Sequence, residues 1–243
     1  RFYYVVNHSS DSVDESVKLG VECSHVIMMD PLTGREGLAK VSPEDGVRIS
    51  IKPGSSLILK TTDRQPDLPP WKHFEPGREY PLQGKWKIDF PDATPYPVGS
   101  VVINRLSSWT TLEKEAQAYS GTAHYRIEFD NPDPKTVSWL LKLGDVRESA
   151  RVTVNGRYVG CAWANPFELH IGPLKPGKNH LEIEVTNLSA NRLRELELSG
   201  KEWKTFHNIN MVNMKYRKFD ATQWQPVPSG LLGPVLLQGG AHE

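Results

Sequence analysis

The side chains in this sequence that are able to do chemistry are its histidines, cysteines, carboxylates and aromatic residues. Its eight histidines are scattered with no pair at ligand spacing, and Cys23 and Cys161 lie far apart along the chain. Structural zinc sites draw on closely spaced cysteines and histidines, so this pattern argues against a zinc centre. We interpret Cys23 and Cys161 as buried free thiols, with a single disulfide between them left open.

Catalytic motifs of fixed spacing do not identify an active site. The sequence contains no Gly-x-Ser-x-Gly elbow, Walker loop or dinucleotide-binding glycine loop. Glycoside hydrolysis needs two carboxylates about 5–10 Å apart, which the 29 acidic residues neither show nor exclude. Glu128, Glu182 and Glu184 occupy the polar phase of alternating segments, where an ionised side chain is simply solvated. The sequence therefore favours no catalytic residue.

One acidic turn, Asp130 to Asp133, offers oxygen atoms of the kind that calcium prefers. It lacks the spacing of a known calcium loop and is typical of an ordinary turn. A calcium cofactor is left open on this ground, and no other cofactor is expected.

The tryptophans are more informative, because flat indole faces suit stacking on the C–H faces of sugar rings. Trp86 and Trp139 fall in the apolar phase of their segments, so we expect both in the core. Trp163 lies between two strand-like segments within 161–166, and Trp109 lies in a non-alternating stretch rich in serine and threonine. Packing within a loop is the alternative for both, but loops often carry function. Trp163 and Trp109 are therefore candidate ring contacts, with Asn165 and Arg147 as polar partners.

Short alternating segments must position these residues. Nineteen glycines and nineteen prolines divide the chain into pieces in which apolar and polar residues alternate with period two, as in 47–51, 123–129 and 181–185. Asn155-Gly156 between two such pieces predicts a tight hairpin, since both residues tolerate positive φ. Helical periodicity is confined to 111–118 and 191–198. The predicted class is all-β.

The composition excludes several classes of protein. With 29 basic and 29 acidic residues the formal net charge is zero, which argues against a nucleic-acid partner. A membrane-spanning helix needs roughly 18 consecutive apolar residues, and no such run occurs in the sequence. We therefore expect a soluble globular protein without a membrane span.

The prolines also indicate how the chain is divided. Residues 62–79 contain four prolines together with Trp71 and Phe74, and a fifth proline follows at Pro81, which predicts an extended linker that packs along a surface. Residues 1–61 are expected to form a small β-sandwich that leans on a neighbour, and residues 80–239 a second, larger sandwich. The first segment starts in a strand-like run, which suggests that the chain begins inside a longer protein.

A set of motifs in the second segment resembles a known family. The segments 120–125, 143–152, 154–156 and 159–160 resemble the galactose-binding-like jelly roll of family 2 glycoside hydrolases. The segments 163–166, 175–181, 185–187, 191–193 and 229–235 resemble most the C-terminal part of family 106 α-L-rhamnosidases. Residues 1–61 resemble the β-rich segment that precedes this domain. One departure is Leu188-Ser189-Ala190, where the family tends to have an aromatic residue.

The resemblance implies a non-catalytic, carbohydrate-associated region of a secreted bacterial enzyme that degrades polysaccharides. It would assist substrate binding or brace a catalytic (β/α)₈ barrel in another part of the polypeptide, since 243 β-rich residues cannot supply such a barrel. Expected partners are plant or microbial glycans, including rhamnose-containing ones, and the barrel itself, in an extracellular or periplasmic location. The alternative is a purely structural or protein-docking sandwich; a chain with its own catalysis is the third hypothesis.

Overall fold

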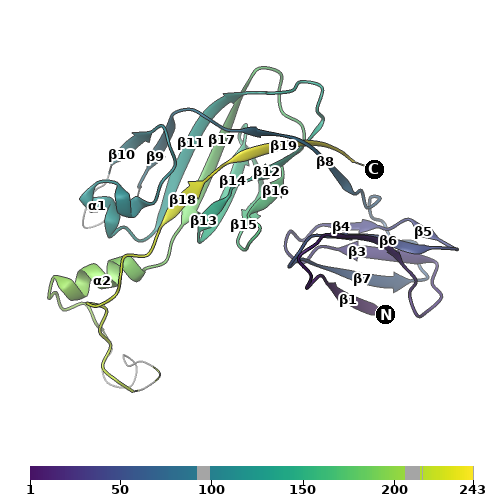
Figure 1. Ribbon diagram of the computed structural model, residues 1–243, viewed down its shortest axis with the longest axis horizontal. Helices are drawn as coiled ribbons and strands as arrows, with labels where there is room; N and C mark the ends of the chain where they lie inside the picture. The colour runs from purple at the N-terminus through teal and green to yellow at the C-terminus, as the bar shows by residue number, and fades with distance from the viewer. Residues whose placement is uncertain (92–98, 206–213, 215, 243) are drawn as a thin grey trace. The chain divides into compact units, whose positions relative to one another are not determined.

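The computed structural model describes residues 1–91, 99–205, 214 and 216–242 of the chain. The chain forms two compact units, one of residues 1–77 with 240–243 and the other of residues 78–239 (Figure 1). Nearly all of the regular structure in both is β-strand, so the predicted all-β class is confirmed. No helix in the described part of the chain has the length and apolar character needed to cross a membrane.

The first unit contains a four-stranded and a three-stranded antiparallel sheet. The four-stranded sheet has the order β1-β7-β3-β4, and the three-stranded sheet the order β2-β6-β5. Their bounds are β1 Phe2–Val6, β2 Val13–Val17, β3 His25–Met29, β4 Glu36–Leu38, β5 Val41–Ser42, β6 Gly46–Ile51 and β7 Ser56–Thr62. Alternate residues of these strands form a small core that includes Val26, Met28, Ile49 and Leu59.

Part of the proline-rich segment completes this first core. The Leu38 amide donates to the Pro69 carbonyl and the Trp71 amide to the Leu38 carbonyl, both at 2.8 Å. Trp71 packs against the core, and the Arg35 guanidinium lies 4.1 Å from its ring centroid. The segment around Trp71 is thus held beside β4.

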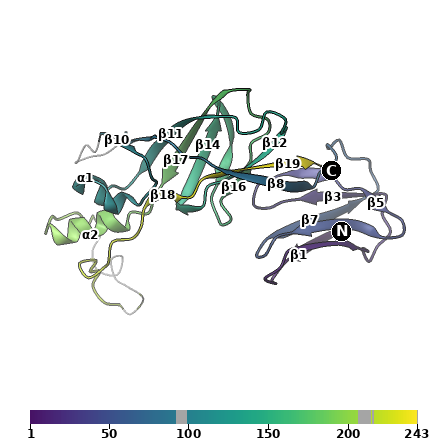
Figure 2. The ribbon, with the colours of Figure 1, turned by 45° about the horizontal axis from the view of Figure 1, so that its top comes forward.

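The second unit is built on a six-stranded sheet of order β10-β9-β11-β17-β14-β15, in which β11, β17 and β14 run side by side (Figure 2). A four-stranded sheet of order β16-β12-β19-β8 and the pair β13-β18 complete it. The bounds are β8 Phe74–Pro81, β9 Trp86–Asp89, β10 Ser100–Ile103, β11 Thr122–Asp130, β12 Ser138–Lys142, β13 Asp145–Arg147, β14 Ser149–Val154, β15 Arg157–Ala162, β16 Glu168–His170, β17 Lys178–Thr186, β18 Gly230–Gly233 and β19 Leu236–His242. Strands β8 and β19 both cross the boundary between the two units.

Local sequence explains several of these elements. The hairpin at Asn155-Gly156 is confirmed: it joins β14 to β15, and the φ angles of the two residues are 53° and 78°. The helical segments are short, namely the 3₁₀ turn η1 (Trp109–Thr111), α1 (Lys114–Gln117) and α2 (Ala190–Leu198). The two predicted helical regions are therefore present, although the first contains less than two turns of α-helix.

The core of the second unit is rich in aromatic residues. Trp86 and Trp139 are 2 % and 0 % exposed, which confirms the prediction from their strand phase. Both cysteines are free, but neither is fully buried as expected: Cys23 is partly buried and Cys161 is exposed. It pairs with Arg151 in the register of β14 and β15, so it shares the polar outer side of the sheet. Strand phase, and not residue type, sets its exposure.

Candidate functional site

The loop between β15 and β16 presents the clearest candidate residue. Strand β15 ends at Ala162, which is buried, and the next side chain, Trp163, is 58 % exposed. Asn165, two residues further along, is also exposed. An indole with this exposure offers a flat apolar surface to a ligand, and a neighbouring amide provides hydrogen-bond donors and acceptors.

Arg147 lies at the same end of the six-stranded sheet as Trp163. It ends β13 two residues before Ser149, which pairs with Thr186 at the end of β17. In the next row Ala150 pairs with Ala162, the residue before Trp163. Since α2 follows β17 after three residues, this end of the sandwich is called the α2 end (Figure 1). The structure thus brings Trp163, Asn165 and Arg147 to one end of the second unit.

Arg147 is oriented by a carboxylate on its own strand. Its Nε lies 2.7 Å from Asp145 Oδ1 and its Nη2 donates to Asp145 Oδ2 at 2.8 Å. The hydrogen bond to Asp145, together with the charge of that carboxylate, raises the pKa of Arg147. Both side chains are 40 % exposed, so the oriented guanidinium is accessible to solvent and can serve as a hydrogen-bond donor at the α2 end.

Trp109 does not belong to this site, which corrects the prediction from sequence. It is 1 % exposed and begins η1, and its ring makes edge contacts with Phe90 and Tyr119 at centroid distances of 5.4 Å each. Its indole nitrogen donates to the buried Tyr125 hydroxyl. A sugar ring has no access to an indole packed in this way, so Trp109 is a core residue.

Two asparagines at the α2 end have a structural role that the sequence did not reveal. Asn187 accepts from the Gly121 amide at 3.0 Å and donates to the Tyr119 carbonyl at 2.9 Å. Asn191 donates to the Val227 carbonyl at 2.7 Å and accepts from the Val227 amide at 2.8 Å. These bonds join distant parts of the chain. In the sequence, the two asparagines were marked only by lying in segments that resemble the rhamnosidase family.

A second aromatic group lies in the segment after α2. Phe219 makes edge contacts with Trp203 and Trp224, at centroid distances of 5.8 and 5.5 Å. Lys204 lies 5.5 Å from the rings of both Trp203 and Phe219, and its Nζ pairs with Glu197 at 2.8 Å. The hydrogen bond from Lys204 lowers the pKa of Glu197. Trp224 is 38 % exposed, but the other members of the group are packed together by these contacts.

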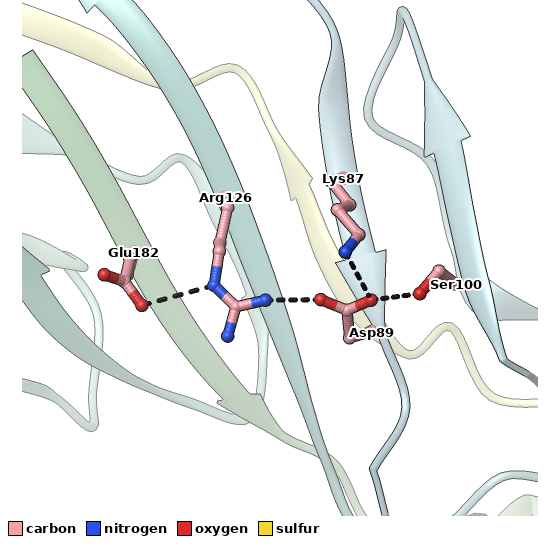
Figure 3. A network of polar contacts seen from close by, with 5 residues as sticks. All are labelled: Lys87, Asp89, Ser100, Arg126 and Glu182. Carbon is pink, nitrogen blue, oxygen red and sulfur yellow. Dashed lines mark hydrogen bonds and ion pairs between the residues drawn. The ribbon is translucent and has the colours of Figure 1, made fainter.

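The outer side of the six-stranded sheet carries a network of charged residues (Figure 3). Asp89 accepts from Ser100 and pairs with Arg126 and with Lys87, the last at 3.4 Å, and Arg126 also pairs with Glu182 at 3.3 Å. The hydrogen bond from Ser100, assisted by Lys87 and Arg126, lowers the pKa of Asp89. An anionic carboxylate held in this way does not act as a general acid near neutral pH.

The acidic turn considered for calcium uses its oxygen atoms within the turn. Asn131 Oδ1 accepts from the Asp133 amide at 3.1 Å, and the Asp133 carboxylate accepts from the Lys135 amide at 3.1 Å and from the Thr136 hydroxyl at 2.9 Å. Among the residues described by the structure, no group of three or more His, Cys, Asp or Glu is placed to hold a metal ion.

Comparison with known proteins identifies the kind of protein in which this fold occurs. No protein-family model matches the chain. The structure is similar over 98 % of its length to a solved rhamnosidase from Novosphingobium sp. PP1Y, with a TM-score of 0.72 and 25 % sequence identity. A putative beta-glucuronidase from Formosa agariphila is 34 % identical over 177 residues, which is 64 % of this chain.

The resemblance to a rhamnosidase predicted from the sequence is thereby confirmed, and both β units take part in it. The chain covers 22 % of the rhamnosidase chain and 15 % of the putative beta-glucuronidase. It is therefore similar to a β-sandwich region associated with glycosidases, and most of each relative lies outside the matched region.

Proposed function

We propose that this chain is a non-catalytic, carbohydrate-associated region of a rhamnosidase-like glycoside hydrolase, with a galactose-binding-like second unit. The observation that carries the proposal is the match of 98 % of the chain to only 22 % of a rhamnosidase. In this proposal the catalytic barrel is another part of the same polypeptide, which acts on rhamnose-containing plant or microbial glycans outside the cytoplasm.

Four carboxylates have a lowered pKa, which makes these four unsuited to act as the acid of a glycosidase. A glycosidase needs a carboxylic acid whose pKa is raised, so that it still carries a proton to donate near neutral pH. Among the described carboxyl groups with a resolved shift, the pKa is lowered at Asp14, Asp89, Glu197 and Asp220. Hydrogen bonds from neighbouring side chains are the first cause in each case, and such bonds stabilise surface anions.

At the α2 end, Trp163 would stack on a sugar ring while Asn165 and Arg147 bond its hydroxyl groups. Each ring or hydrogen-bond contact of this kind contributes about 1 kcal/mol, part of which is offset by the loss of ligand freedom. The expected dissociation constants are therefore about 0.1–10 mM. Such affinity suits a region that holds a polymeric substrate near a separate catalytic site.

Titration of the chain with rhamnose-containing oligosaccharides, followed by NMR, tests this proposal. We expect shifts in the indole signal of Trp163 and loss of binding in Trp163→Ala. Tyr158→Ala is the matched control, because Tyr158 is an aromatic residue of similar exposure, 53 %, on the outer side of the sheet. Wild-type binding that persists unchanged in Trp163→Ala contradicts the site assignment.

Hydrolysis of 4-nitrophenyl α-L-rhamnoside tests the non-catalytic role separately. The chain alone is expected to release no nitrophenol above the buffer rate. Turnover that disappears on replacing one carboxylate within residues 80–238 would show that the chain has its own active site.

A structural or protein-docking role is the second candidate function. Phe2 and Tyr4 on the first strand favour it, because each is an aromatic side chain with 68 % exposure. A chain that binds none of the oligosaccharides but stabilises a catalytic domain would support this function over the first.

A further inference from the structure

The four-stranded sheet of the first unit is apolar on both of its sides. One side contributes Tyr3, Val5, Val26, Met28, Leu57 and Leu59 to the core. The opposite side, here called the β1 face, consists of Phe2, Tyr4, Ile27, Met29, Leu38 and Ile58. Because successive side chains of a strand point to opposite sides of the sheet, these six residues lie on the side away from that core.

The strand register places the β1 face in two adjacent rows. Phe2 and Ile27 both pair with Lys60, and Leu38 pairs with Ile27. In the next row Tyr4 and Met29 both pair with Ile58. Cross-strand neighbours on one side of a sheet lie about 5 Å apart, so Tyr4, Ile58 and Met29 form one contiguous row, with Phe2 beside Tyr4 on the same strand. In the other row Lys60 lies between Phe2 and Ile27, and Ile27 is only 8 % exposed. The charged residues within these two rows are Lys60 and Glu36, at the register positions beside Phe2 and Met29.

Two other outward sheet sides in the described part of this protein are polar. In the three-stranded sheet of the first unit, Asp14 and Arg48 form an ion pair at 2.8 Å. The six-stranded sheet of the second unit carries the network around Asp89 and Arg126 (Figure 3). An antiparallel sheet with one side in water normally alternates in this manner. The β1 face departs from the pattern, and Phe2 and Tyr4 are 68 % exposed on it.

Strand β1 is also the edge of its sheet. A hydrophobic edge strand invites pairing with another chain or segment unless a partner covers it. Contiguous exposed apolar patches are typical of protein interaction sites, whereas sugar sites combine aromatic rings with several convergent polar groups. The β1 face has only two charged residues in its rows. Its composition is therefore that of a site that binds another protein surface and not that of a sugar site.

We propose that the β1 face docks on the catalytic part of the glycoside hydrolase polypeptide to which this region belongs. This inference rests on the proposed function. The comparison indicates which partner covers the β1 face. The first unit lies within the match to the rhamnosidase, and the 78 % of that chain outside the match provides further protein for the face to contact. A second copy of the chain is the competing occupant, and a homodimer would have to bury the same patch.

Hydrogen exchange by mass spectrometry tests the docking without any substitution. The 243-residue chain is compared with the polypeptide that the complete gene encodes. We expect amides of β1 and β7 to exchange at least tenfold more slowly in the longer polypeptide, while those of β2 and β6 exchange equally in both. Equal exchange of β1 and β7, or a gene that encodes no further domain, overturns the proposal.

Paired substitutions identify the occupant. Phe2→Ser with Tyr4→Ser should lower the melting temperature of the longer polypeptide by several degrees and leave that of the 243-residue chain within about one degree, because exposed side chains contribute little to folding. The control Val137→Ser with Tyr158→Ser removes apolar residues that are 72 % and 53 % exposed elsewhere, and should change neither protein.

Light scattering during size-exclusion chromatography separates the two occupants. A dimer of the 243-residue chain that the Phe2/Tyr4 variant converts to a monomer would assign the face to a second copy and overturn the proposal. The Trp163 titration is independent of all these measurements. Failure of docking with intact sugar binding therefore refutes this inference alone, whereas sugar binding that persists unchanged in Trp163→Ala refutes only the proposed contact site.

Discussion

The indole nitrogen of Trp109 donates a hydrogen bond to the hydroxyl of Tyr125, at the centre of the second unit. The same hydroxyl accepts from the Leu231 amide at 3.0 Å. Burial raises the pKa of Tyr125 to about 12, so the phenol stays neutral at physiological pH. One oxygen atom on β11 thus satisfies two buried donors, one from η1 and one from β18, and links these three elements.

Tyr125→Phe is expected to destabilise the chain by about 1–3 kcal/mol, because it leaves the buried Trp109 and Leu231 donors without an acceptor. Urea denaturation followed by tryptophan fluorescence measures the change. Tyr158→Phe removes a hydroxyl from an exposed ring and should shift the free energy of unfolding by less than about 0.5 kcal/mol. Equal effects of the two substitutions would contradict the role given to the Tyr125 hydroxyl.

Gly230→Ala should also weaken this junction. A Cβ at Gly230 would lie 2.3 Å from Trp109 Nε1 and 2.6 Å from the Tyr125 hydroxyl, and the residue has a φ of +94°. Relief of the clash requires movement of core rings, at a cost of about 2–4 kcal/mol. Gly20→Ala, with no atom within 4 Å of the new Cβ, is the control for thermal melting. An unchanged melting temperature in Gly230→Ala would refute the close packing.

The two tryptophans first considered as ring contacts should respond in opposite ways to truncation. Trp109→Ala removes a buried side chain and is expected to cost about 3–5 kcal/mol of stability. Trp163→Ala removes an exposed one and should change stability by less than about 0.5 kcal/mol. Chemical denaturation of both variants decides the matter, and a Trp163→Ala chain that fails to fold would mean that this tryptophan supports the core.

Asp89 should give the second unit a measurable dependence on pH. Its pKa is lowered in the folded chain, so its ionisation stabilises the fold above the unfolded value of about 3.9, and this stability is lost as the pH falls through the folded pKa. Asp89→Asn should cost about 0.5–1 kcal/mol at pH 7, and the difference from wild type should shrink below about pH 4.

Melting curves of wild type and Asp89→Asn between about pH 2.5 and pH 7 measure how the difference in stability between the two proteins changes with pH. Asp67→Asn alters an exposed carboxylate in the first unit and serves as the control. A constant difference between wild type and Asp89→Asn across the whole range would show that the ionised network does not stabilise the fold.

Shortened chains test how far each unit stabilises itself. Residues 78–239 contain the large aromatic core and are expected to melt cooperatively. Residues 1–64 lack Trp71 and the backbone bonds between Leu38 and the 69–71 segment, so they should be less stable than residues 1–77. Circular dichroism during heating compares the three chains. Equal melting of 1–64 and 1–77 would show that the segment around Trp71 is dispensable.

Strand periodicity explains why part of this structure was predictable from sequence. It placed Trp86 and Trp139 in the core, because a residue in a regular strand inherits its side of the sheet from its neighbours. Asn155-Gly156 fixed a hairpin by local conformational preference alone. Trp109 lies in a 3₁₀ turn without such a phase, and its burial depends on Phe90, Tyr119 and Gly230, which are distant in sequence.

The β1 face was only partly visible in the sequence. Phe2 to Val6 is apolar throughout, which indicates a strand with two apolar sides but does not identify the strands beside it. The pairing of β1 with β7, and of β7 with β3, creates the patch by aligning Tyr4, Ile58 and Met29. For the same reason, spacing alone did not show that Arg147 and Trp163 reach one end of the sandwich.

The two hydrogen bonds between Asn191 and Val227 fasten together the points at which the intervening segment leaves and rejoins the sandwich. Strand β18 begins three residues after Val227. Its position is therefore set by these two hydrogen bonds and not by the length of the segment between Asn191 and Val227. A peptide or fluorescent protein inserted between Asn191 and Val227 is therefore expected to leave the strands of the sandwich undisturbed.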